Sequence, residues 1–285
     1  MKKILYISIA ILALAACNKQ APETGSNEIS FSIGYPSTRA TASEFESGDA
    51  VGIYAVEWQG DVQYPLQVGG NYINNERLSY DGTAWTASRA LYWSSKPCDF
   101  YALYPYQSGI ASVDKFPFSL ALDQNGEGYE TSDLLFAYAE NVSKANGQVA
   151  LNFKHIMSKL VVRVLKGEKF EGEIPDDIEA HVYNTTSSCF VDISKGSVAK
   201  DPFGAKNTLT MKKIDNQRFE AVIVPQNIEK RTPLIELTMG GIAYLLEYSL
   251  SFRPGYVHYV DLTLNTSPDQ EMIEITIDPG INDWD

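Results

Sequence analysis

The feature of this sequence that most restricts its fold is the alternation of apolar and polar residues along many short stretches. In residues 28–33, for example, Ile29, Phe31 and Ile33 alternate with polar residues. Alternate side chains share one face of a strand, whereas a helix repeats every 3.6 residues. We therefore predict an all-β fold of antiparallel sandwiches, with strands bounded by Gly, Pro, Asn and Asp. Further stretches of this kind contain Val51/Ile53/Ala55, Phe100/Ala102/Tyr104, Val149/Leu151/Phe153, Leu160/Val162/Val164 and Phe219/Ala221/Ile223.

Two local patterns add detail to this prediction. Residues 133–140 are the best candidate for a helix, although they are long enough for only one or two turns. The pair Asp81-Gly82 predicts a two-residue hairpin turn, because such a turn needs positive φ at both central positions.

The N-terminus has the pattern of a lipoprotein signal peptide. A basic start is followed by an apolar run at residues 4–14 and then by Leu14-Ala15-Ala16-Cys17, which has the form of a lipobox. We expect residues 1–16 to be removed and the Cys17 thiol to carry the lipid, including palmitate. A signal peptide that contains a cysteine by chance is the alternative. Residues 17–27 are polar and predict a flexible tether.

Charge and composition exclude several classes of function. The formal net charge is −13, which makes nucleic acid an unfavourable partner. His155, His181 and His258 lack a second ligand at metal spacing, so we expect no metal and no cofactor. The carboxylates of Asp176-Asp177 predict a solvated turn, and no nucleophile or phosphate-loop motif occurs, so we predict no enzymatic activity.

The mature chain is long enough for two domains. The segment VALNFKHIMSKLVVRVL, residues 149–165, contains two strand patterns joined by a short apolar link. We place the boundary there and predict an N-terminal domain at residues 28–156 and a C-terminal domain at 157–285. Cys98 and Cys189 then fall in different domains, so we expect buried free thiols, with a disulfide as the alternative.

Several motifs along the whole chain together resemble the fimbrillin family of Bacteroidales surface pili, in its Mfa-like branch. The resemblance implies two tandem transthyretin-like β-sandwich domains and export as an outer-membrane lipoprotein. It also implies a role at the cell surface as a subunit of a fimbria. The motifs are the lipobox, SGDAVGIYA (47–55), LYW (91–93), DFYALYPY (99–106), DLL (133–135), FKH (153–155), SKL (158–160), VPQ (224–226), FRPGY (252–256) and INDW (281–284).

In polymerising members of this family, a trypsin-like protease cuts after an arginine and releases the first strand. The resemblance carries this role to Arg39, which is the only basic residue between Lys19 and Arg77, with cleavage before Ala40. Small polar residues flank Arg39, as a nicking site requires. The alternative is that Arg39 is an ordinary solvated loop residue. The displaced strand would contain Ile29, Phe31 and Ile33.

The chain ends on a segment, residues 271–285, that we predict to be a donor strand. Its Ile273, Ile275 and Ile277 have the same spacing as the three apolar residues of the first strand, and could replace them by strand addition. Beyond Pro279-Gly280, Ile281 and Trp284 could act as apolar anchors.

We therefore predict a structural pilus subunit, in a stalk or accessory position, assembled by protease-triggered donor-strand exchange and supporting adhesion. Its expected partners are other fimbrial subunits, the outer membrane through Cys17, and host or bacterial glycans or proteins. The alternative is a non-polymerising surface lipoprotein that binds glycans through exposed aromatic residues, with Trp58, Tyr64 and Tyr72 as candidates.

Overall fold

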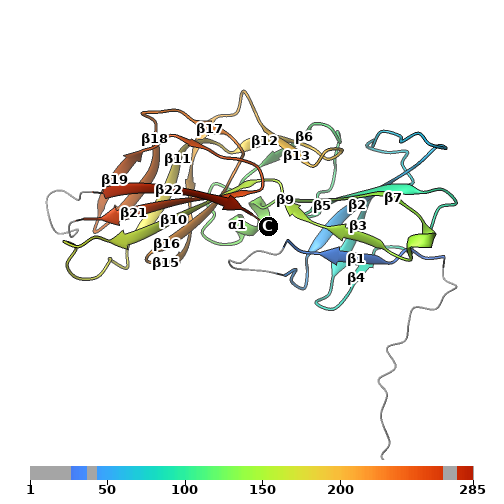
Figure 1. Cartoon of the computed structure of the whole chain (residues 1–285), viewed down its shortest axis with the longest axis horizontal. Helices are drawn as coiled ribbons and strands as arrows, with labels where there is room; N and C mark the ends of the chain where they lie inside the picture. The colour runs from blue at the N-terminus through green and yellow to red at the C-terminus, as the bar shows by residue number, and fades with distance from the viewer. Residues whose placement is uncertain (1–26, 37–43, 266–274, 285) are drawn as a thin grey trace, which may run out of the picture.

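The computed structural model describes residues 27–36, 44–265 and 275–284, which form mainly strands (Figure 1). The helical segments within these residues are α1 (Glu127–Ser132) and the 3-10 turn η1 (Lys144–Asn146). The prediction of an all-β fold is confirmed. The helix expected at residues 133–140 is wrong, because this segment mostly belongs to strand β7 (Leu135–Val142), in which Leu135 and Ala137 are buried at alternate positions.

A six-stranded sheet with only antiparallel neighbours forms the N-terminal half (Figure 1). One face packs Ile53 and Phe100 into a cluster that we call the N-terminal cluster. The opposite face carries Tyr54 and Leu103, which belong to a second and larger cluster, the C-terminal cluster. In spatial order the strands are β4 (Trp85–Ala87), β3 (Ile73–Tyr80), β2 (Ala50–Glu57), β5 (Cys98–Tyr104), β7 and β9 (Lys154–His155).

The hairpin between β3 and β4 has a longer turn than the sequence predicted. Tyr80 pairs with Trp85, which leaves four residues in the connection. The Asp81 carboxylate accepts hydrogen bonds from the backbone N–H groups of Thr83 and Ala84, both at 2.8 Å. Gly82 has φ +94°, whereas Asp81 does not have positive φ. The aspartate side chain thus stabilises a wider turn than the two-residue form.

Two further sheets pack against each other in the C-terminal half. Val162 and Phe219 from one sheet and Val182 and Leu237 from the other are buried in the C-terminal cluster. The pair β10–β21 is parallel, which adds a parallel neighbour to a mostly antiparallel fold. One sheet has the order β15 (Lys212–Asp215), β16 (Arg218–Ile223), β10 (Ser158–Lys166), β21 (Tyr256–Leu264), β22 (Ile275–Asp283), and the other β14 (Lys206–Thr210), β11 (Glu179–Thr186), β18 (Pro233–Met239), β19 (Ile242–Glu247).

The two halves are joined by more than the link at residues 156–157. Strand β6 (Phe116–Ser119) comes from the N-terminal half of the chain but pairs with β12 (Ser188–Asp192), which in turn pairs with β13 (Ser197–Lys200). The Gln124 amide, fully buried, donates to the Val222 carbonyl at 2.9 Å and accepts from the Val222 N–H at 2.7 Å. A short pair, β17 (Asn227–Ile228) and β20 (Leu250–Ser251), completes the C-terminal half. The predicted boundary at 156/157 stays a prediction.

Both described cysteines are buried free thiols, as expected. Burial is the main reason that the pKa of each rises to about 12, with nearby carboxylates adding to the effect. Both thiols are therefore protonated and unreactive at neutral pH. In the part of the chain that the structure describes, none of the helices has the length and apolar character needed to span a bilayer.

Candidate functional site

The first strand, β1 (Phe31–Gly34), lies between two other segments of the N-terminal half. It runs parallel to β8 (Val149–Asn152), with Phe31 opposite Val149. Just before β1, the Ile29 N–H donates to the Leu91 carbonyl at 2.7 Å. On the other flank, the Val149 N–H donates to the Ser30 carbonyl at 2.9 Å. Ile29 is thus hydrogen-bonded to Leu91, whereas residues 30–34 are paired with β8.

The side chains of this segment alternate as the sequence indicated. Ile29 is buried in the N-terminal cluster, and Phe31 and Ile33 pack against it half-buried. The Phe31 ring meets the Phe100 ring edge-on, with centroids 6.2 Å apart. The polar residues between them are exposed. Removing this segment would therefore uncover both an apolar face and unpaired backbone groups.

Several predicted sites lie outside the described residues. These are the lipidation site Cys17, the cleavage candidates Arg39 and Ala40, and Ile273 of the donor segment. The described chain breaks off after Pro36, which is buried, and resumes at Glu44. The predictions for these residues stay predictions.

The terminal strand β22 lies at the edge of its own sheet. Among the described strands it pairs with β21 alone, antiparallel over nine residues, from Tyr256 opposite Asp283 to Leu264 opposite Ile275. Ile277 packs half-buried against the C-terminal cluster, whereas Ile281 is 45% exposed. The other described side chains of the strand, at 276, 278–280 and 282–283, are exposed. The strand therefore shares few buried contacts with the fold to which it belongs.

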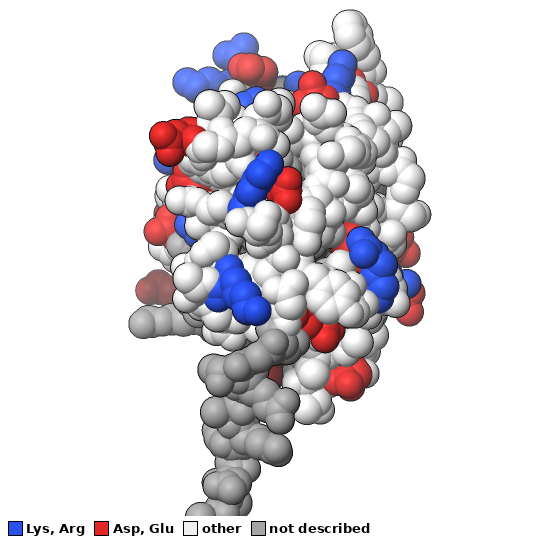
Figure 2. Space-filling view, turned by 90° about the vertical axis from the view of Figure 1, so that its right-hand side faces the viewer, with Lys and Arg blue, Asp and Glu red and all other residues white. Residues whose placement is uncertain are grey.

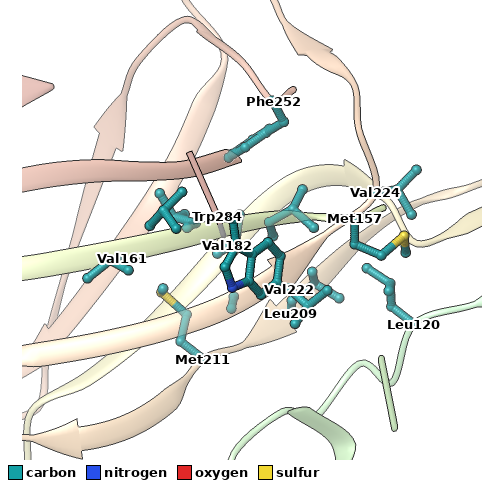
Figure 3. Packing of buried hydrophobic residues seen from close by; sticks show 14 of the residues in the cluster. Leu120, Met157, Val161, Val182, Leu209, Met211, Val222, Val224, Phe252 and Trp284 are labelled. Carbon is teal, nitrogen blue, oxygen red and sulfur yellow. The ribbon is translucent and has the colours of Figure 1, made fainter. Parts of the chain in front are cut away.

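Trp284, directly after β22, is the exception, because only 4% of it is exposed. Its indole lies among residues of the C-terminal cluster such as Val161 and Val222 (Figure 3). Its backbone N–H donates to the Gly255 carbonyl at 2.8 Å. The indole also stacks on His155 with ring centroids 3.9 Å apart and an interplanar angle of 9°. The C-terminal end of β22 thus lies at the junction between the halves (Figure 1), where Trp284 stacks on His155.

His155 is the last residue of β9 and lies in a polar part of this junction. Its Nδ1 is 2.9 Å from Asp133 Oδ1. Close by, Lys159 and Glu220 form a buried ion pair at 2.7 Å, and the Tyr129 hydroxyl donates to Glu220 at 2.9 Å. Burial alone would raise the pKa of Glu220, but Lys159 and its other partners hold that pKa below the usual value. These contacts keep the charged groups paired where water is excluded.

The sequence did not predict this junction pocket. Phe153-Lys154-His155 and the final tryptophan were noticed as family motifs, and Trp284 was expected to anchor on a neighbour. Stacking between His155 and Trp284 joins residues from opposite halves of the chain, and no local pattern encodes such a contact. The best signal for this pocket was the proline and glycine of FRPGY. Gly255 has φ +73°, and its carbonyl accepts the Trp284 N–H.

The loop that carries the candidate glycan-binding residues Trp58, Tyr64 and Tyr72 contains both structural and exposed aromatic side chains. Trp58 donates its indole N–H to Asp99 at 2.8 Å, and Asp99 is fully buried. Tyr64 is 48% exposed and Tyr72 38% exposed, and the Tyr72 hydroxyl donates to the backbone carbonyl of Tyr92. The face at this end of the molecule is mostly uncharged, with single basic and acidic side chains scattered over it (Figure 2).

The remaining polar candidates have structural contacts. Asp176 and Asp177 are exposed, and their side chains bind Asn216 and the Gly240 N–H. His258 Nε2 accepts the Arg253 N–H at 3.0 Å. Among the described residues, no group of three or more His, Cys, Asp or Glu side chains could hold a metal ion.

Comparisons with known proteins agree with this fold. A crystal structure of a candidate cell adhesion protein from Bacteroides uniformis matches with 19% identity and TM-score 0.70, covering 91% of this chain and all of that one. A similar protein from Bacteroides ovatus gives 17% and 0.67, over 90% and 96% of the two chains. A fimbrial protein from Bacteroides vulgatus gives 13% and 0.57, over 91% and 100%. These likenesses show a shared fold.

Comparison with curated proteins gives no match. The family model described as fimbrillin-like matches residues 38–284, which is most of the sequence. This chain therefore belongs to the fimbrillin-like family.

Proposed function

We propose that this chain is a subunit of a cell-surface fimbria that is exported as an outer-membrane lipoprotein on Cys17. It joins other subunits by exchange of terminal strands and so supports adhesion. Membership of the fimbrillin-like family and the fold shared with a Bacteroides vulgatus fimbrial protein support the fimbrial role. The role is structural, not catalytic, and the position in the fibre is a stalk or accessory one.

The observation that carries strand exchange is the position of β22. It is an edge strand that is hydrogen-bonded on one side, and most of its described side chains are exposed. An edge strand can leave a sheet without opening the sheet between two neighbours. The last strand of the chain can thus be given to another copy while β21, β10 and β16 stay paired.

The receiving site is the place of β1. Without this strand, backbone groups of β8 and of residues 91–93 lose their partners, and each buried unpaired group costs about 1–3 kcal/mol. A strand that runs parallel to β8 and carries alternating apolar side chains restores both the hydrogen bonds and the buried face. Residues 273–277 of a second copy have that spacing.

The decisive test is deletion of residues 269–285 in the full-length protein. The deleted chain should be exported and protease-cut normally but should not enter fimbriae, as measured by electron microscopy and by ladders on denaturing gels. The variant Asp278→Asn, which changes an exposed side chain of the same strand, should polymerise normally. Normal fimbriae built from the deleted chain would reject strand donation.

Cleavage and lipidation have separate tests. Arg39→Ala should leave the subunit uncut, and Arg77→Ala, which removes the next basic residue along the chain, should not. Unchanged processing of Arg39→Ala on a gel would exclude that site. Palmitate label should be lost in Cys17→Ala and kept in Cys98→Ala, and label retained by Cys17→Ala would exclude the lipobox.

One observation favours glycan binding as a second candidate function. Tyr64 and Tyr72 are exposed on the loop next to the exposed Tyr92, where rings could stack on sugars. Glycan-array binding that is lost in Tyr72→Ala, in a protein that never polymerises, would favour this function over the fimbrial one. Trp58 is a poor candidate for binding a sugar, because its indole N–H is hydrogen-bonded to Asp99.

A further inference from the structure

The terminal strand depends on one buried side chain at its end. Trp284 is 4% exposed, whereas Ile281 on the same strand is 45% exposed. Of the described side chains from 276 onward, only Ile277 shares part of the core with Trp284. Backbone pairing with β21 at an edge is open to water along one side. Apart from its backbone pairing with β21, the described part of this segment is therefore held to the core mainly by Trp284.

The pocket is built on the link between the two halves. Gly255, whose carbonyl accepts the Trp284 N–H, donates its own N–H to the Met157 carbonyl at 2.7 Å. A side chain at Gly255 would approach the His155 carbonyl to 3.2 Å, so this loop lies close against the link. The Lys159 ammonium lies 5.8 Å from the centre of the indole, in reach of a cation–π contact. Trp284 is thus packed against the residues that link the two halves.

The same pocket is in contact with the end of the first strand. Tyr35 directly follows β1, and its ring meets the His155 ring edge-on at 6.3 Å, with an angle of 85°. His155 therefore contacts both Tyr35 and Trp284. Its Nδ1 is held by Asp133, but its buried Nε2 has no hydrogen-bond partner among the described residues. One polar contact and two aromatic neighbours fix the orientation of the ring.

We propose that the His155 pocket is a docking site for Trp284, and that the first strand keeps Trp284 in this site through Tyr35. While β1 is in place, Tyr35 holds His155 against the indole, and β22 stays on its own sheet. When β1 is withdrawn, Tyr35 goes with it and His155 loses its support on that side. Trp284 then leaves the pocket more readily. Opening of the receiving groove and release of the donor strand are linked events in one subunit.

The link to polymerisation rests on the proposed function, but the contact itself is tested in the intact, uncut monomer. Hydrogen exchange followed by mass spectrometry reports the protection of amides in β21 and β22. Trp284→Ala should raise exchange in β22 at least tenfold, whereas Ile281→Ala should change it less than threefold. Trp284→Leu keeps an apolar side chain without the stacking, and serves if the alanine variant loses structure elsewhere. Unchanged β22 protection in the Trp284 variants would overturn the docking site.

The role of the first strand has its own variant. Tyr35→Ala should raise exchange in β22 at least fivefold, although Tyr35 belongs to the opposite half of the molecule. Leu78→Ala is the matched control, because it weakens the N-terminal cluster from β3, which three strands separate from β9 in the sheet. If Tyr35→Ala and Leu78→Ala affect β22 equally, the link between the two ends of the chain is wrong. These results do not depend on fimbria formation, so they would stand even if the deleted chain formed normal fimbriae and strand donation were rejected.

Discussion

At the scale of single residues, Asp99 organises the loop above the N-terminal sheet. Its fully buried carboxylate accepts hydrogen bonds from the side chains of Trp58, Gln63 and Tyr138 and from the Asn141 N–H. Asp99→Ala would leave these donors without a partner, so we expect the free energy of unfolding to fall by about 3–5 kcal/mol. Urea denaturation followed by tryptophan fluorescence measures this. Asp61→Ala, an exposed carboxylate of the same loop, should stay within about 0.5 kcal/mol of the native protein; a similar value for Asp99→Ala would contradict the role.

His258 makes stability depend on pH. Burial, together with the nearby Arg253 charge, lowers the pKa of His258 to about 4. As the pH falls, His258 takes up a proton near pH 6.5 in the unfolded chain but only near pH 4 in the folded protein. The free energy of unfolding is therefore not reduced by this group above about pH 6.5. It should decline by on the order of 2 kcal/mol as pH falls from 6.5 to 4. His258→Gln cannot titrate at this position, so the urea midpoint of the native protein should fall relative to that of the variant as the pH decreases. A constant difference would refute the assignment.

The residue scale also shows what sequence alone could supply. Ile29, Phe31 and Ile33 were identified by their spacing, because alternation states directly which side chains share a face. Asp99 and Asp133 could not be identified, because an isolated aspartate near a strand end looks the same whether it caps a turn or binds distant donors. Trp58 illustrates this, since its indole N–H donates to Asp99, which lies 41 residues further along the chain.

At the scale of elements, the first and last strands differ in how firmly they are packed. Phe31→Ala removes a ring that packs against Phe100, so we expect a loss of about 2–3 kcal/mol in unfolding free energy. Ser32→Ala, on the exposed side of the same strand, should change it by less than about 0.5 kcal/mol. Chemical denaturation of both variants provides the measurement. Equal effects would mean that β1 does not present its apolar face to the N-terminal cluster.

Alternation predicted strands reliably but not their place in a sheet. The patterns around Val51, Phe100, Val149 and Leu160 all became strands, because a buried sheet face requires that period. An edge strand and a central strand can share the same pattern, so the edge position of β22 could not be foreseen. The failed helix at residues 133–140 has a related cause: pairing with β5 decided the conformation of a segment too short to decide its own.

At the scale of the whole molecule, segments that precede residue 156 contribute strands and buried side chains to the C-terminal half. The segment Phe116–Ser119 carries no strong strand pattern, yet it pairs with β12 in the other half. Ile110, Val113 and Leu120 are buried in the C-terminal cluster, although they precede the predicted boundary. Local composition could not predict these contacts, because they join residues that are far apart in the sequence.

This crossing predicts how the molecule unfolds. Because β6 and Gln124 tie the halves together, calorimetry of the full-length chain should show one cooperative transition instead of two. Gln124→Ala removes two buried hydrogen bonds to the Val222 backbone and should lower the transition temperature by about 5 °C. Gln59→Ala, an exposed glutamine, should leave it unchanged. Two separate transitions in the native protein would mean that each half is stabilised by its own core alone. Withdrawal of the first strand would then destabilise the N-terminal half without affecting the C-terminal half.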